Sequence, residues 1–318
     1  MHPKTQRIVF FGTPDFAVPC LQAIIESGRD IVQVITQPDK PKGRGKQLAA
    51  PAIKVYCQQQ NIPYLQPKKI KTEAFYTQLE QFKADIFVVV AFGRIFTSRH
   101  LSICPYTLNV HASLLPKWRG ASPIQRSLQY GDQQTGISIM QLVEELDAGD
   151  VMYQAAIDIG PNMRFEDLSQ QLSSLGAESI VKALDLIDQD KAHFEQQNHA
   201  QASFCPPIKV EEAQINWKKP SLDIHNLIRA FHLWPGAFCS DGQNRIKILH
   251  SQLSDPPEHL LTQNNYTGGQ LIYGKKQLWV KTADAWLEIL EVQMPGKKQV
   301  PIQAFLAGYK NKNIDRWQ

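Results

Sequence analysis

The sequence lacks several features that mark whole classes of protein. Its five cysteines are scattered over 318 residues with no CxxC pair, which argues against a disulfide framework and a zinc site, so we expect no metal. No run approaches the roughly 18 apolar residues of a transmembrane helix. No signal-peptide pattern precedes the first strand-like segment, and 18 glycines and 20 prolines are too few for a collagen-like chain. We therefore expect a cytoplasmic protein with no membrane contact.

Apolar residues are plentiful, while net charge is small and unevenly placed. A hydrophobic fraction of 43% in 318 residues is enough for about two domains with their own cores. Acidic and basic side chains balance over residues 1–190, so the net charge of +4 lies in 191–318. An excess of this size is usually solvated surface, although it is compatible with a polyanionic partner.

The first part of the chain alternates strand-like and helix-like segments. Short runs that are apolar throughout indicate strands buried on both faces, and apolar residues three or four apart indicate helices. The strands are expected at 7–12, 31–36, 62–65, 85–92, 107–112 and 136–142, and the helices at 16–26, 50–60, 72–83 and 163–189. Such βα units predict a doubly wound, Rossmann-like α/β domain with a parallel sheet over residues 1–189.

The second part of the chain has a different pattern. Residues 190–207 are rich in Gln, His and Ala, which predicts a linker. One helix, 221–231, is then followed by five short strand-like runs between Asn, Gly and Pro turns, which predicts a small OB-like β-barrel over 208–318. These runs are 237–240, 245–252, 269–273, 277–280 and 285–293, and we expect Trp217, Trp234, Trp279 and Trp286 to lie in the core.

Asn109 and His111 form the densest candidate for chemistry. Alternate residues of a strand face the same side, so the two side chains lie together while Val110 faces the other way. They stand near the carboxyl end of an expected parallel strand, where open α/β sheets bind ligands. An amide can stabilise an oxyanion and an imidazole can move a proton near neutral pH. The alternative is that both residues merely satisfy the end of the strand.

Asp147 is the expected partner of His111. It follows the next strand, so adjacent strand ends can bring its carboxylate to the imidazole and orient the ring. Spacing alone prefers it only weakly over Glu144, Glu145 and Asp150, which are otherwise loop charges.

Two loops remain to be interpreted. The turn after the first strand has a single glycine, Gly12, and no GxGxxG pattern, which disfavours a nicotinamide or flavin site. Residues 40–46 (KPKGRGK) hold four cations among two glycines and a proline. Such a run is usually a solvated loop, but near the carboxyl edge of the sheet it can embrace phosphates.

The segments NVHASLLPKWRGASPIQ (109–125) and GISIMQLVEELDAGDV (136–151) closely resemble the formyltransferases that use 10-formyltetrahydrofolate. Further segments place the resemblance in the branch that acts on methionyl-tRNA, and together they span most of the chain. They are RIVFFGTPDFAVPCL, TQPDKPKGRGKQLAAPAIK, VVVAFGRI and INWKKPSLDIHNLIRAFHLWPGAF.

The resemblance implies an activity and a set of site residues. Asn109, His111 and Asp147 would catalyse transfer of the formyl group of 10-formyltetrahydrofolate, a co-substrate, to the α-amine of methionine on initiator tRNA. Ser113, Leu114, Leu115 and Pro116 would border the folate site. Lys42, Arg44 and Lys46 in the basic loop, with Lys209 in the second domain, would contact tRNA, and we expect a monomer.

Two other functions stay open at this stage. The same three residues could serve a formyltransferase whose acceptor is a small amine, against which the basic loop and the positive second domain argue. A non-catalytic RNA-binding protein on the same scaffold is the other, and the intact trio of Asn109, His111 and Asp147 speaks against it.

Overall fold

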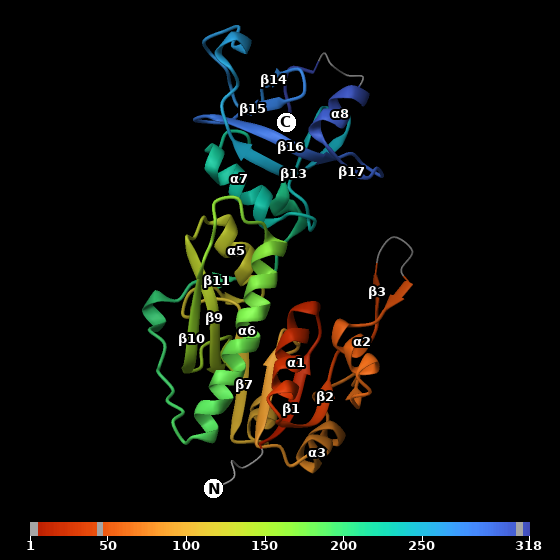
Figure 1. Ribbon diagram of the computed structural model, residues 1–318, viewed down its shortest axis with the longest axis vertical. Coiled ribbons are helices and arrows are strands. Elements are labelled where there is room, and N and C mark those ends of the chain that lie inside the picture. Colours follow the sequence, from red (N-terminus) through yellow and green to blue (C-terminus); the bar gives the residue numbers. More distant parts are fainter. Residues whose placement is uncertain (1–5, 43–46, 310–313) are drawn as a thin grey trace. The chain divides into compact units, whose positions relative to one another are not determined.

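The computed structural model describes residues 6–42, 47–309 and 314–318 (Figure 1). The chain divides into two compact units. Unit 1 comprises Met1–Pro123, Gln134–Ile157 and Ser169–Cys205, and unit 2 comprises Ile124–Gln133, Asp158–Leu168 and Pro206–Gln318. The chain thus crosses between the units several times.

Unit 1 is built on a seven-stranded sheet with the order β10-β9-β7-β6-β1-β2-β5. The strands are β1 (Arg7–Gly12), β2 (Asp30–Ile35), β5 (Tyr64–Leu65), β6 (Ile86–Val90), β7 (Tyr106–His111), β9 (Gln134–Gln141) and β10 (Val151–Asp158). The pairs β1–β2, β1–β6, β2–β5 and β6–β7 are parallel. The doubly wound α/β fold expected from the sequence is confirmed, and the expected strand at 7–12 matches β1 residue for residue.

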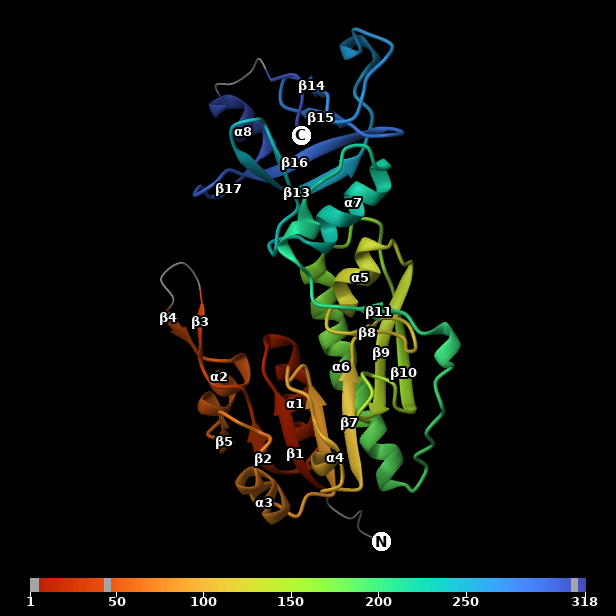
Figure 2. The same cartoon turned by 180° about the vertical axis from the view of Figure 1, so that it is seen from behind.

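Helices cover both faces of this sheet (Figures 1 and 2). They are α1 (Val18–Glu26), α2 (Ala52–Gln59), α3 (Glu73–Gln81), α4 (Ser98–Leu101) and α6 (Phe165–Asp188), of which α6 begins in unit 2. Thr72 caps α3 as expected, because its hydroxyl accepts from the Phe75 N–H at 3.3 Å. Phe11 and Phe87 of the sheet pack with Phe75 of α3 in one apolar cluster, which fixes the central strands.

The strand β9 departs from the expected parallel arrangement. It pairs with β7 in the antiparallel sense, with Leu108 opposite Gln141 and His111 opposite Ser138. The carboxyl end of β9 therefore lies beside the start of β7, not beside its end. The apolar pattern of this strand is the same in either direction, so its residues do not indicate the reversal.

Two short strand pairs complete unit 1. The strands β3 (Lys40–Lys42) and β4 (Gln47–Ala49) pair in the antiparallel sense. The strand β8 (Arg119–Gly120) pairs in parallel with β11 (Phe204–Cys205). Residues Phe204 and Cys205 fall inside the stretch 190–207 that the sequence predicts as a linker.

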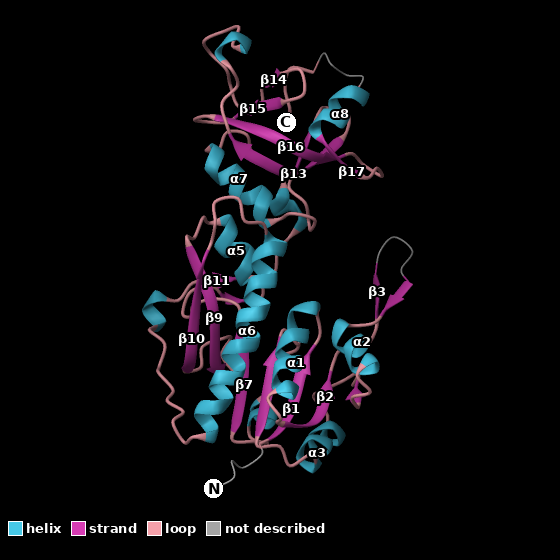
Figure 3. Ribbon diagram, viewed as in Figure 1, coloured by secondary structure: helices cyan, strands magenta, loops and turns pink. Residues whose placement is uncertain are grey.

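Unit 2 contains an antiparallel six-stranded sheet that curls into a half-barrel (Figure 3). Its order is β12-β13-β16-β15-β14, with β17 paired to β16, which confirms the expected small β-barrel class. The strands are β12 (Phe238–Ser240), β13 (Arg245–Leu253), β14 (Leu271–Tyr273), β15 (Leu278–Lys281), β16 (Trp286–Gln293) and β17 (Gln299–Pro301). Its helices are α5 (Pro123–Gln129), α7 (Ser221–Ala230) and α8 (Ile302–Gly308).

The expectation that four tryptophans lie in the core is correct for three of them. Trp217, Trp279 and Trp286 are buried, whereas Trp234 is 59% exposed. Trp234 follows Leu233, which has a φ of 50°, and precedes the turn at Gly236, which has a φ of 83°. This tight turn projects the indole outward, and composition could not reveal that.

Candidate active site

The central strand β7 positions Asn109 and His111. Asn109 pairs with Val89 of β6 on one side and with Met140 of β9 on the other. Because both neighbours hold the backbone, the two side chains project from a fixed frame. Asn109 is half-buried, His111 is 5% exposed, and Val110 between them is buried.

The imidazole of His111 is held from two sides. Its Nε2 lies 2.9 Å from the carbonyl oxygen of Trp118, and its Nδ1 lies 3.6 Å from Oδ2 of Asp147. A carbonyl oxygen can only accept, so Nε2 carries a proton in this arrangement, and Nδ1 faces the carboxylate, which attracts it when the ring is protonated. The ring is therefore oriented by one tight bond and one looser contact.

Asp147 reaches this position by a route that the sequence did not indicate. Because β9 ends beside the start of β7, the loop after it must double back along the strand before β10 begins. Asp147 adopts a left-handed backbone with a φ of 49°, and its Oδ2 accepts from the Gly120 N–H at 2.8 Å. That bond anchors the carboxylate next to His111.

The neighbouring acids lie in different surroundings. Glu144, Glu145 and Asp150 are exposed, whereas Asp147 is 9% exposed. Glu144 Oε1 accepts from the Ser98 N–H at 2.9 Å, and Glu145 Oε1 lies 3.6 Å from Arg119 Nη1. The structure thus separates the one buried carboxylate beside His111 from the loop charges, a choice that spacing left open.

The segment Ser113–Pro116 is tightly held by its own hydrogen bonds. The Ser113 hydroxyl is buried and donates to the Lys117 carbonyl at 2.5 Å. Ser138 of β9 donates to the Ser113 carbonyl at 2.6 Å and accepts from the Leu115 N–H at 3.0 Å. Leu114 and Pro116 keep partial exposure, while Ser113 and Leu115 are buried. The buried Ser113 therefore stabilises the conformation of this segment.

The four cations expected to contact tRNA lie in two units. Lys42 ends β3, and Arg44 and Lys46 lie outside the described residues. Lys209 belongs to unit 2, where it is exposed and precedes the 3-10 turn Val210–Ala213.

The backbone groups of Trp118 and Gly120 that hold His111 and Asp147 could not be found from the sequence, because every residue has a carbonyl and nearly every residue an N–H.

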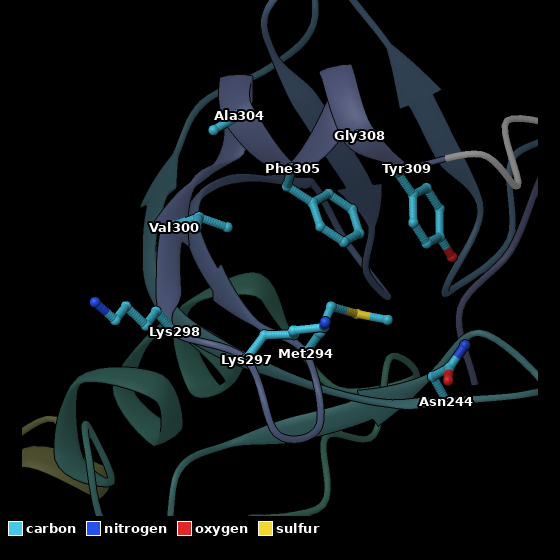
Figure 4. A pocket seen from close by; sticks show the side chains of 9 residues that line it. All are labelled: Asn244, Met294, Lys297, Lys298, Val300, Ala304, Phe305, Gly308 and Tyr309. Carbon is cyan, nitrogen blue, oxygen red and sulfur yellow. The ribbon is translucent and has the colours of Figure 1, made fainter.

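Unit 2 has a hollow of about 530 Å³ between the β16–β17 hairpin and α8 (Figure 4). Phe305 points into it beside Met294, and Lys297 and Lys298 stand at its rim. Tyr309 packs against Phe305 with ring centroids 4.4 Å apart, and its hydroxyl donates to Asp241 at 2.6 Å. The hollow thus combines an apolar floor with two cations, Lys297 and Lys298.

Neither a metal-binding cluster nor a membrane-spanning helix occurs among the described residues. In the ranges 6–42, 47–309 and 314–318, no group of three or more His, Cys, Asp and Glu side chains is placed to hold a metal ion. Within the same part of the chain, no helix has both the length and the apolar character needed to cross a membrane.

Both the part of the chain that contains this site and the half-barrel part match models of one class of enzyme, the formyl transferases. Residues 6–184 match the formyl transferase family and residues 207–310 match the formyl transferase C-terminal domain. The chain belongs to the formyl transferase family.

Relatives with assigned names cover nearly the whole chain. A methionyl-tRNA formyltransferase of Moorella thermoacetica is 38% identical over 304 residues, which is 95% of this chain and 96% of that protein. One from Nitrosomonas eutropha is 40% identical over 305 residues, 95% of each.

Solved structures share the fold at lower identity. The sugar 3N-formyl transferase WlaRD superposes with a TM-score of 0.66 at 19% identity, covering 93% of this chain and all of that one. A methionyl-tRNA formyltransferase from Clostridium thermocellum gives 0.55 at 15% identity, covering 78% and 94%.

Proposed function

We propose that this chain transfers the formyl group of 10-formyltetrahydrofolate to the α-amine of methionine on initiator methionyl-tRNA. The observation that carries the proposal is the 3.6 Å approach of His111 Nδ1 to Asp147 Oδ2, beside Asn109 on a central strand. Relatives named methionyl-tRNA formyltransferase, at 38 and 40% identity over 95% of the chain, support this acceptor.

In the proposed reaction the amine attacks the formyl carbon, a C–N bond forms, and a tetrahedral oxyanion develops. The C–N10 bond of the folate then breaks, and the proton lost by the amine goes to N10. The Asn109 amide donates to the oxyanion, which is the kind of preorganised stabilisation that lowers such barriers. His111 assists the proton transfer through Nδ1, because Trp118 already holds Nε2.

Asp147 has two tasks in this scheme. Its carboxylate orients the His111 ring and stabilises the positive charge that develops on it. It also helps to relay the proton from the amine. The Gly120 N–H keeps the carboxylate in place through the bond at 2.8 Å, so little reorganisation is needed during the reaction.

The remaining assignments divide between the two domains. We propose residues 1–189 as the catalytic domain, 190–207 as the connection and 208–318 as the tRNA-binding domain. The segment Ser113–Pro116 borders the folate. Lys42, Arg44, Lys46 and Lys209 contact the tRNA backbone, which positions a nucleic acid without reading its sequence. Lys297 and Lys298 at the hollow in unit 2 add cations for the same purpose.

A formyl-transfer assay tests the proposal. The purified chain is supplied with 10-formyltetrahydrofolate and, in parallel, with charged initiator methionyl-tRNA, uncharged initiator tRNA or an amino sugar nucleotide. We expect formylated product from the charged tRNA alone. Transfer to the small amine with comparable kcat/KM, and none to the tRNA, would show a different member of the family. Size-exclusion chromatography with light scattering checks the expected monomer.

A further inference from the structure

The segment 195–205, which lies within the predicted linker, is hydrogen-bonded to the rest of unit 1 at three places. Glu195 and Val151 exchange both backbone hydrogen bonds, each of 2.9 Å. The Arg119 N–H donates to the Ser203 carbonyl and the Ala121 N–H to the Cys205 carbonyl, both at 2.8 Å. Between these attachments lies the side chain of Gln197, which forms the third. The segment therefore borders both β8 and the loop that carries Asp147.

The amide nitrogen of Gln197 holds the backbone of the Asp147 loop. Nε2 donates to the Asp147 carbonyl at 2.9 Å and to the Gly149 carbonyl at 2.7 Å. Gln197 is 6% exposed, so water competes little for these bonds. The two acceptors stand on either side of Ala148, and the first belongs to the residue whose backbone is in the left-handed region. The amide thus fixes the turn that aims the carboxylate.

Arg119 fixes which end of the Gln197 amide faces that loop. Its Nε and Nη2 donate to Gln197 Oε1 at 3.1 and 2.8 Å. The guanidinium only donates, so it selects the oxygen and turns Nε2 toward the two carbonyls. Arg119 is 1% exposed, and a charge buried to this degree is costly unless it is paired or hydrogen-bonded. The two hydrogen bonds from Arg119 therefore hold the Gln197 side chain and also determine the orientation of its amide.

We infer that Gln197, oriented by Arg119, is a positioning residue that sets the Asp147 carboxylate against the ring of His111. It acts through the backbone of the Asp147 loop and does not touch the reacting atoms. Its catalytic consequence rests on the proposed function. Its effect on the His111 ring does not, because that effect belongs to the protein without substrate.

The substitution Gln197→Glu separates the contact with Arg119 from the hydrogen bonds to the Asp147 loop. Glutamate has nearly the same shape and still accepts from Arg119, but its ionised carboxylate cannot donate to the carbonyls of Asp147 and Gly149. The matched control is Gln196→Glu, which places the same charge on the adjacent, exposed residue. A second variant, Arg119→Lys, keeps a cation but loses the two-point hold on Gln197 Oε1.

We expect Gln197→Glu to lower kcat by about 10- to 100-fold, a typical cost of losing a supporting hydrogen bond, while KM for both substrates changes less than about twofold. The NMR signals of the His111 ring, recorded without substrate, shift in Gln197→Glu and not in Gln196→Glu. Arg119→Lys changes kcat and the ring signals in the same direction by a smaller amount. Circular dichroism confirms that each variant is folded.

The inference is overturned if a folded Gln197→Glu or Arg119→Lys protein matches Gln196→Glu in both kcat and the His111 signals. A wild-type protein that formylates no methionyl-tRNA would instead refute the proposed function. In that case the ring signals still decide the positioning role, so the two failures are distinguishable.

Discussion

His111 Nδ1 lies 3.6 Å from Asp147 Oδ2, although β7, which carries His111, and β9, which precedes Asp147, run in opposite directions. The approach depends on a loop that doubles back after β9 and on the Gly120 N–H, which donates to the Asp147 carboxylate at 2.8 Å. The candidate site is therefore made by backbone contacts around three side chains.

The charge of Asp147 is the first target. Asp147→Asn keeps the size of the side chain and an oxygen that accepts from Gly120, but it removes the negative charge that orients the ring. We expect kcat to fall by about 10²- to 10³-fold, within the range for impaired proton transfer. The exposed neighbour gives the control, Asp150→Asn, which should retain near-normal kcat. If the two variants turn over at the same rate, Asp147 has no part in catalysis.

The Asp147 loop has no room for a side chain at position 149. A Cβ at this position would lie 1.9 Å from the Gln141 carbonyl oxygen, so the backbone would have to move. We expect Gly149→Ala to cost about 1–3 kcal/mol of unfolding free energy and to reduce kcat about tenfold or more by displacing Asp147. Gly160→Ala, where the new Cβ meets Met163 Cβ at 4.0 Å, should change neither. Equal stability and activity of both variants would contradict the crowding argument.

The assignment of Arg44 to tRNA is tested by salt dependence. Arg44→Ala should lower kcat/KM for charged tRNA about tenfold and reduce the slope of log(kcat/KM) against log[salt] by about 1, since one phosphate contact is lost. KM for the folate should not change. Lys69→Ala removes an exposed cation outside the basic loop and serves as the control. Equal losses toward tRNA and folate would rule out this role for the loop.

Glu212 is expected to make stability depend on pH. Arg126 Nη1 donates to Glu212 Oε2 at 2.7 Å and the Lys209 N–H donates to Oε1 at 2.8 Å. The hydrogen bond from Arg126 lowers the pKa of Glu212 most, against the effect of burial, with the Lys209 N–H adding to it. A depressed folded-state pKa stabilises the fold above the unfolded value, near 4.3, and this contribution is lost as the pH falls through the folded value.

Glu212→Gln should therefore unfold about 1 kcal/mol more easily at pH 7, since the carboxylate is partly exposed and solvent weakens the pair. The difference should close as the pH drops below about 4. Denaturant titrations at several pH values measure it, with the exposed neighbour variant Glu211→Gln as reference. A gap that persists unchanged at acid pH would show that the carboxylate charge is not its cause.

Several features could be predicted because they depend on local pattern. The strand β6 is apolar throughout, β1 is buried after its first residue, Arg7, and α3 begins at a Thr cap, so their positions follow from hydrophobic pattern and capping. Asn109 and His111 share a strand face for the same reason. Other elements gave little signal: β10 has a mixed burial pattern, and β17 is three residues long.

The sequence by itself determined the two domain types, the family resemblance and the placement of Asn109 and His111 on one face of a strand. Tertiary structure alone decided the direction of β9, the exposure of Trp234 and the attachment of Gln197 to the Asp147 loop. The reason is physical. Periodicity and side-chain chemistry are local properties of a chain, whereas strand direction and hydrogen bonds to distant backbone groups depend on where separate segments meet.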